Sequence, residues 1–438
     1  MMPAIGNWIV TRVDAHPGRV LAAVLAVAAV ALLANSLLAP IDYAGPDGET
    51  YEEGGWEAAT LGVFACGHSG RAFWSPGWIA TVAFVYKAAG HRPRAVRVFL
   101  VVLALGTALL TYFIARQLAG HRSALVAALL FPFSKLVFRY TTFYQYEVLL
   151  ALLVTACGFL VLHHRSAGRA WEPARFAVAG LLMGWAALVS PRVLAFVPLL
   201  ALLLLRRHGR RPAITGILAA TAGIAMVLVP WTIRNYRCYN DVIVTTTNGG
   251  INLYIGNNEH STGGYHMPTP EERPPYHLDD SASWRREALR YMAAHPGRTA
   301  GRAVVKALRF WNPHYGDQFL VALLFVAGWV RCVRWRGKRA DAERAWVLAA
   351  PFAMMAVHMI FFVQPRYMIP VLPFACIVAG AGVFGWRPRR PRSTRPAVAP
   401  ARNRGRSART PVRDRSGPAR ELSGETDPAR CPDPSGPS

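Results

Sequence analysis

Long apolar runs, each ended by arginine or lysine, decide what this sequence can fold into. A run of about 20 apolar residues crosses the hydrocarbon core of a bilayer as one helix. Only helices and closed barrels satisfy their backbone hydrogen bonds there. We therefore predict an all-α, polytopic membrane protein with about ten transmembrane helices. The runs cover residues 19–38, 95–117, 122–140, 147–163, 175–190, 192–206, 212–232, 317–334, 345–363 and 367–387.

Basic residues between these runs predict the orientation. Clusters such as the four arginines within 206–211 fall on one side of the predicted bundle, whereas the opposite short turns carry single arginines. Because short cytoplasmic loops are enriched in Arg and Lys, we place both termini in the cytoplasm of a plasma-membrane protein. The long loops 39–94 and 233–316 are then extracytoplasmic, and we expect interfacial helices in them. Cys66 and Cys238 fall in these outer loops and could pair.

Composition separates three regions: a cytoplasmic N-terminus (1–18), a membrane domain (19–387) and a basic tail (388–438). The tail is rich in Arg, Pro, Ser and Gly and has few large apolar residues, so we predict that it is disordered and cytoplasmic. Anchoring near anionic lipid is its simplest role, and a regulatory or partner-binding role is the alternative. The net charge of +25 does not indicate nucleic acid, because no basic helix face with interleaved aromatic residues is present.

Polar motifs lie where the apolar runs end. Residues 230–265 are rich in Gly, Asn and Thr directly after a run, which is typical of a binding surface. In the first outer loop, Asp47 opens an acidic stretch that predicts a helix. A carboxylate there can act as a general base or simply cap the helix. Within residues 71–90, an aromatic-Pro-Gly-aromatic element begins a short apolar helix that has too few residues to span the bilayer.

Taken together, the motifs resemble the GT-C superfamily of polyprenyl-phosphate-sugar glycosyltransferases. The nearest branch is the bacterial protein O-mannosyltransferase family (glycosyltransferase family 39), over residues 19–385. Asp47-Gly-Glu49-Thr-Tyr51 resembles the family element Asp-Glu-x-x-Tyr, in which the Asp is the catalytic base. Glu147 is similar to the acid that begins the fourth helix of the family. The other matching stretches are 73–78, 190–192, 230–235, 248–257, 295–297 and 366–370.

This resemblance implies inverting transfer of a mannose-type sugar from a polyprenyl-phosphate donor to an acceptor hydroxyl at the outer face of the membrane. Asp47 is the predicted general base, and Glu49 and Glu147 are supporting acids, with pairing to cations the preferred role of Glu147. The departing phosphate needs fixed cations. The candidates are Arg192, Arg234, Arg366, Lys135 and Arg139. The residues predicted to form the sugar or acceptor pocket are Tyr51, Trp74, Asn252, Asn257 and Asn258.

The partners expected from the resemblance are the lipid-linked donor, membrane lipids, and a protein, polysaccharide or glycolipid acceptor. No metal-ligand spacing is visible, so we assign no metal-binding residue, and a divalent ion stays open as a cofactor. His358 has no partner at ligand spacing, and we expect a core or interface role for it.

Two alternatives stay open. One is a transporter or flippase of lipid-linked sugars, which predicts repeat-related broken helices. The other is a non-catalytic relative that binds such lipids, because Gly48 and Ser75 depart from the family pattern.

Overall fold

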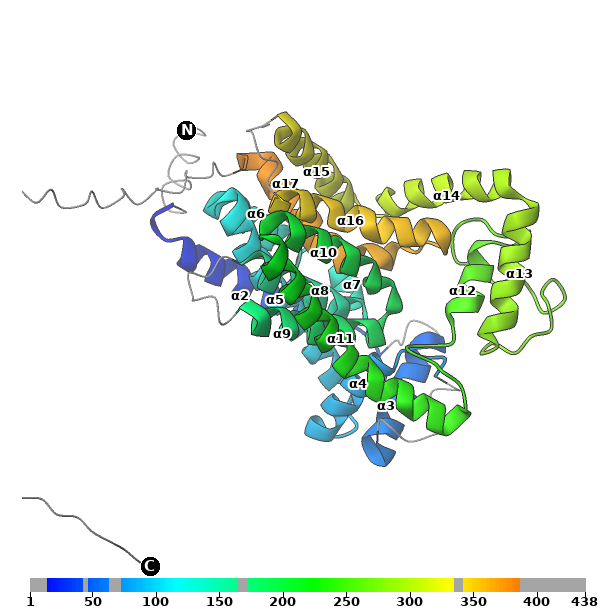
Figure 1. The fold of residues 1–438 in the computed structure, drawn as a ribbon. Coiled ribbons are helices and arrows are strands. Elements are labelled where there is room, and N and C mark those ends of the chain that lie inside the picture. Colours follow the sequence, from blue (N-terminus) through cyan, green and yellow to red (C-terminus); the bar gives the residue numbers. More distant parts are fainter. Residues whose placement is uncertain (1–13, 42–45, 63–71, 164–171, 335–341, 387–438) are drawn as a thin grey trace, which may run out of the picture. The chain divides into compact units, whose positions relative to one another are not determined.

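The computed structural model is built of helices (Figure 1). The residues that it describes are 14–41, 46–62, 72–163, 172–334 and 342–386. Within them there is no β-strand, and one isolated parallel bridge joins Gly264 to Val363. The all-α prediction is therefore confirmed. The predicted tail (388–438), most of the predicted N-terminus and Cys66 lie outside the described residues.

The helices follow the predicted runs along the chain. Their bounds are α2 (Pro17–Leu38), α3 (Pro46–Leu61), α4 (Pro76–Ala89), α5 (Pro93–Ala119), α6 (His121–Leu130), α7 (Lys135–Tyr140), α8 (Glu147–Leu162), α9 (Glu172–Val189), η2 (Pro191–Ala195), α10 (Phe196–Arg207), α11 (Arg210–Tyr239), α12 (Gly249–Gly256), α13 (Ser281–Ala294), α14 (Pro296–Trp311), α15 (Gly316–Arg334), α16 (Ala342–Ile360), η3 (Pro365–Val371) and α17 (Leu372–Phe384).

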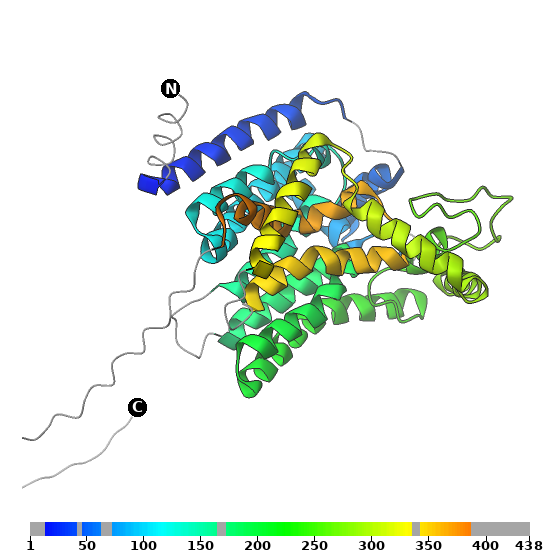
Figure 2. The ribbon, with the colours of Figure 1, turned by 90° about the horizontal axis from the view of Figure 1, so that it is seen from above.

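Six of the described helices are long and apolar enough to cross a membrane: α2, α5, α9, α11, α15 and the continuous unit of η3 and α17. Two shorter apolar helices, α6 and α8, complete this set. Chain order and helical character match the predicted runs, while the number of spans stays a prediction. Figure 2 shows α2 (blue) along one side of the bundle, where it packs against α5 and α6.

Prolines divide several runs into a short turn followed by a helix. The run 122–140 splits between α6 and α7, and two later runs begin as the 3₁₀ turns η2 and η3. Pro191 and Pro365 stand at the starts of those turns, where a missing backbone N–H costs nothing. The interruptions matter for function because Arg192 and Arg366 lie within them.

Helix α11 is longer than the run 212–232 predicts, because it continues through Pro230 to Tyr239. The hydroxyl of Thr232 donates to the carbonyl of Leu228 within this stretch. The helix ends at Asn240, whose φ of 51° is the left-handed conformation common at helix C-termini. The loop that follows α11 therefore begins later than the predicted residue 233.

Close helix packing relies on small residues. A Cβ on Gly180 of α9 would lie 2.1 Å from the carbonyl oxygen of Ala220 in α11. A Cβ on Gly223 of α11 would lie 2.3 Å from the carbonyl oxygen of Ala177. The two backbones can approach this closely only because the side chains are absent.

Two groups of helices bring polar residues to one end of the bundle. Helices α3 and α4 pack together as a hairpin, and α4 also contacts α9. Helices α12, α13 and α14 lie together beside the end of α16 (Figure 1). The α14 side chains Phe310 and Trp311 pack against α15 and α16.

Candidate active site

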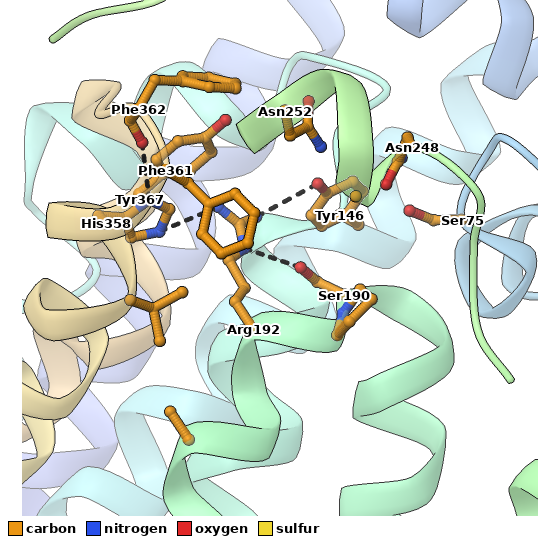
Figure 3. Close-up of a pocket in the computed structure, with 14 residues that line it drawn as sticks. Ser75, Tyr146, Ser190, Arg192, Asn248, Asn252, His358, Phe361, Phe362 and Tyr367 are labelled. Carbon is orange, nitrogen blue, oxygen red and sulfur yellow. Dashed lines mark hydrogen bonds between the residues drawn. The ribbon is translucent and has the colours of Figure 1, made fainter. Parts of the chain in front are cut away.

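A cavity of about 280 Å³ lies where these groups meet the bundle (Figure 3). Its walls come from the starts of α4, α8, α12 and η2, the end of α16, and η3. The residues that line it are Ser75, Tyr146, Ser190, Pro191, Arg192, Ala195, Asn248, Gly249, Asn252, Val357, His358, Phe361, Phe362 and Tyr367. Hydroxyls and amides thus share the surface with aromatic rings, which is common in small-molecule sites.

Arg192 is held against this cavity by several partners. Its Nε donates to the hydroxyl of Ser190 at 2.7 Å, and its Nη2 donates to the hydroxyl of Tyr146 at 3.2 Å. Its Nη1 lies 3.5 Å from Nε2 of His358. The guanidinium also lies 4.1 Å from the ring centroid of Tyr367. Because every nitrogen has a partner, the position of this cation is well defined.

Four charged residues form a continuous series beside the cavity, which we call the charge chain: Asp47, Arg366, Glu147 and Arg192. Arg366 Nη2 lies 3.5 Å from Oδ2 of Asp47, and Arg366 Nε lies 3.4 Å from Oε1 of Glu147. The same oxygen of Glu147 lies 3.7 Å from Arg192 Nη2. The predicted base, Asp47, is thus in direct contact with a predicted phosphate cation, Arg366.

Exposure changes sharply along the charge chain. The side chain of Asp47 is 45% exposed and that of Glu147 is fully buried, with both arginines almost covered. Both oxygens of Glu147 lack a hydrogen-bond donor among the described residues. Its contacts with the two guanidiniums are therefore ionic rather than hydrogen-bonded, so either arginine can turn toward another anion without breaking a hydrogen bond to Glu147.

Aromatic residues connect α3, which carries Asp47, to the wall of the cavity. Tyr51, one turn after Asp47 in α3, packs edge-on against Trp74 and Tyr146 at centroid distances of 5.5 and 5.9 Å. Its hydroxyl donates to Ser75. Burial raises the pKa of Tyr51 well above its usual range, so the hydroxyl stays protonated. Tyr51 thus joins α3 to two cavity-lining residues, Ser75 and Tyr146, as a neutral hydrogen-bond donor.

Among the predicted asparagines, only Asn252 lines the cavity. Asn257 donates to the carbonyls of Leu253 and Ile360, and Asn258 donates to that of Tyr254. Their amides are therefore used to fold the wall behind the cavity, which favours a rigid cap as the role of residues 248–265, and we call this segment the polar cap. Glu49 is exposed.

Two predicted cations, Lys135 and Arg139, lie near the N-terminal end of α15. The ammonium of Lys135 lies 5.0 Å from the ring centroid of Tyr315, and Arg139 donates to the hydroxyl of that tyrosine. Helix α7, which carries both cations, packs against η3. They do not line the cavity, but they flank the turn that carries Arg366.

Arg366 does not line the cavity either, and the remaining predicted cation, Arg234, lies in a separate cluster. It is buried, donates to Asn235 and Tyr239, and stacks over Trp231. These contacts fix the end of α11. Arg234 is not among the residues that line the cavity.

The sequence predicted a core or interface position for His358, but it did not predict that this residue lines the cavity. The residue is buried, yet it lines the cavity and contacts Arg192, which is 166 positions away. Tyr146, Ser190 and Tyr367 were also missed. Each lies within two residues of a predicted site residue, so that proximity was the signal available.

Within 14–41, 46–62, 72–163, 172–334 and 342–386, no group of three or more His, Cys, Asp or Glu could hold a metal ion. The two carboxylates nearest the cavity, those of Asp47 and Glu147, already contact arginines.

Comparisons with known proteins identify the fold and a family that part of the chain resembles. Residues 75–233 match the family model of dolichyl-phosphate-mannose-protein mannosyltransferases. The fold is similar to crystal structures of ArnT from Cupriavidus metallidurans, with a TM-score of 0.55, 17% identity and 83% of this chain covered for the form bound to undecaprenyl phosphate. The chain has the GT-C fold. The resemblance stated from the motifs is thereby confirmed.

The relatives are distant and longer. The chain spans 59% of the length of that ArnT chain. An Archaeoglobus fulgidus oligosaccharyltransferase in complex with Zn and sulfate gives a TM-score of 0.53 at 14% identity, with 82% of this chain and 48% of that chain covered. The same organism's AglB, with an inhibitory peptide and a dolichol-phosphate, gives a TM-score of 0.51 at 11% identity, with 83% of this chain and 50% of that chain covered. No curated protein sequence matches the chain.

Proposed function

We propose that this protein transfers a sugar from a polyprenyl-phosphate donor to an acceptor hydroxyl, with inversion at C1, at the extracytoplasmic face of the membrane. The observation that carries the proposal is the charge chain, in which the half-exposed carboxylate of Asp47 contacts Arg366, and Glu147 links Arg366 to Arg192 in the cavity wall. A mannose-type sugar is the donor favoured by the family description.

Arg192 and Arg366 are suited to the leaving phosphate. Charge grows on the phosphate oxygens as the bond to C1 breaks, and fixed cations in a site shielded from water stabilise it most. Glu147 holds both guanidiniums before the donor arrives, so that two like charges can stay close together. Lys135 and Arg139 extend this positive region along α7.

Asp47 is suited to the base. The acceptor oxygen attacks C1, the bond from C1 to the phosphate oxygen breaks, and the hydroxyl proton passes to the Asp47 carboxylate. No general acid is required, because a phosphate leaves well without a proton, in contrast to the sugar leaving group of a glycosidase. The first turn of α3 leaves this carboxylate exposed enough to reach an acceptor.

The cavity suits the sugar. Asn248 and Asn252 offer amides for hydroxyl groups, while Phe361 and Tyr367 offer flat apolar faces. The acceptor can be a protein, a polysaccharide or a glycolipid, because Asp47 is exposed and accepts a proton from any hydroxyl that reaches it.

The cysteines support an extracytoplasmic site. Cys238, near the end of α11, is disulfide-bonded, and disulfides persist in oxidising compartments. Its partner lies outside the described residues. Cys157 and Cys376, which lie within apolar helices, are free.

The test is sugar transfer in membranes by wild type, Asp47→Asn and Glu53→Gln. Glu53 is an exposed carboxylate on the same helix and serves as the matched control. Loss of a general base predicts a rate lower by about a hundredfold to ten-thousandfold for Asp47→Asn, and no change for Glu53→Gln.

Equal rates for wild type and Asp47→Asn would remove Asp47 from the mechanism. Donor binding without transfer by the wild type would favour a non-catalytic lipid-sugar-binding protein. Movement of the intact donor across the membrane would favour a flippase.

A further inference from the structure

We propose that His358 is a positioning residue, which orients Arg192 toward the cavity from a fixed point in the cavity wall. The proposal rests on the proposed function in one respect, namely that Arg192 contacts the donor phosphate. His358 belongs to α16, whereas Arg192 belongs to η2, so the contact joins two separate elements (Figure 3).

The hydrogen bonds of His358 define its tautomer. Its Nδ1 lies 2.8 Å from the carbonyl oxygen of Phe362. A carbonyl can only accept, so Nδ1 carries the hydrogen and donates. The lone pair of a neutral ring is then on Nε2, which lies 3.5 Å from Nη1 of Arg192 and accepts from it. A doubly protonated ring would instead place two cations side by side.

The carbonyl of Phe362 is a firm anchor because its neighbours are tied down. The carbonyl of Ile360 accepts from Asn257 at 2.7 Å and from Lys306 at 3.3 Å. The N–H of Val363 donates to the carbonyl of Gly263 at 3.0 Å. Residues on both sides of Phe362 are therefore bound to the polar cap. Because His358 binds the carbonyl of Phe362 and also contacts Arg192, the position of Arg192 is tied to that of the cap.

Ring packing holds His358 independently of its hydrogen bonds. The imidazole stacks on Tyr367 at 4.3 Å with an interplanar angle of 14°, and on Phe310 at 6.1 Å with an angle of 20°. A phenylalanine at position 358 would keep this stacking and lose both hydrogen bonds. Packing and positioning can thus be separated by substitution.

The experiment measures binding of undecaprenyl phosphate, a sugar-free lipid phosphate, to the purified full-length protein in nanodiscs. We expect His358→Phe to weaken binding about tenfold, the size expected for a lost hydrogen bond to a charged group. His358→Asn can still donate to Phe362 but is too short to reach Arg192, and should behave like His358→Phe. His358→Gln presents its Oε1 near the position of Nε2, and should bind within about threefold of wild type.

A double mutant separates positioning from general damage. In an Arg192→Gln background, His358→Phe should change binding by less than about twofold, because the residue that it positions is gone. Wild-type binding by His358→Phe, or independent effects of the two substitutions, would overturn the proposal. Elution profiles and melting temperatures report folding, and if His358→Phe does not fold, the comparison of Asn with Gln decides.

The outcomes also separate this inference from the proposed function. A wild-type protein that binds undecaprenyl phosphate, together with an unaffected His358→Phe variant, would reject only the role of His358. A wild-type protein that does not bind this lipid phosphate would reject the proposed function itself.

Discussion

Lys306 is a cation buried completely behind the cavity wall. Its ammonium donates to the side-chain oxygen of Asn257 and to the carbonyl of Ile360, both at 3.3 Å. Burial lowers the pKa of Lys306 to about 8, and the nearby charge of Arg302 acts in the same direction. The side chain joins α14, α12 and the end of α16 at the cost of keeping a charge away from water.

Stability should therefore respond to pH through Lys306. An unfolded lysine titrates at its ordinary value of 10.5. Between pH 8 and that value, the unfolded chain binds a proton that the native protein lacks, so native stability rises with pH in this window. We expect the melting temperature of wild type in detergent to rise between pH 8 and 10 relative to that of Lys306→Met. Lys306→Arg stays charged and is the control. Parallel curves for wild type and Lys306→Met would contradict this assignment.

Three residues of the charge chain, Glu147, Arg192 and Arg366, could be found from sequence because each stands where an apolar run begins. Asp47 lies inside a loop and was found through the resemblance of its motif, and the structure brings it into contact with Arg366. His358 could not be found in this way, because it lies inside an apolar run and its partner is distant in sequence. Hydrogen-bond partners of this kind leave no local pattern.

At the scale of elements, the α3–α4 hairpin controls where Asp47 lies. Gly54 and Gly55 of α3 face α4 side by side, but the space around them differs. A Cβ on Gly55 would lie 2.3 Å from Val82, which would force the helices apart. A Cβ on Gly54 would lie 3.5 Å from Ile79, an ordinary contact distance.

This difference predicts opposite results for two neighbouring alanine substitutions. Gly55→Ala should displace α3 and lower sugar transfer about tenfold or more, because misplaced catalytic groups are costly. Gly54→Ala should transfer sugar at close to the wild-type rate. Rates measured in the same membranes decide, and equal rates for the two variants would show that hairpin packing does not set the position of Asp47.

Helix boundaries were the part of the elements that sequence predicted least well. Apolar length located the helices, but it could not show that α11 continues through Pro230 or that the run 122–140 breaks into two helices. The break in the run 122–140 falls around Pro132, a local signal that apolar length does not use. The end of α11 is fixed by a polar side chain, because Asn235 donates to the carbonyl of Ile243.

At the scale of the whole molecule, the orientation in the membrane is a prediction from the distribution of arginine. A single cysteine at Leu278, in the loop before α13, should react with a membrane-impermeant maleimide in intact cells. A cysteine at Arg210, the first residue of α11, should react only after permeabilisation. Both positions are exposed, so accessibility alone does not separate them. Labelling of position 210 in intact cells would reverse the orientation and move the site to the cytoplasm.

In one part of the cavity wall, backbone groups hold the chain in place while side chains line the cavity. Residues 360–363 are fastened through backbone groups, whereas Phe361 and Phe362 contribute only their rings to the interior. Exchanging those rings for other side chains would alter the shape of the chamber while its frame stays in place. Under the proposed function, changes in sugar preference can therefore be sought first at these two adjacent positions, without rebuilding the scaffold that holds them.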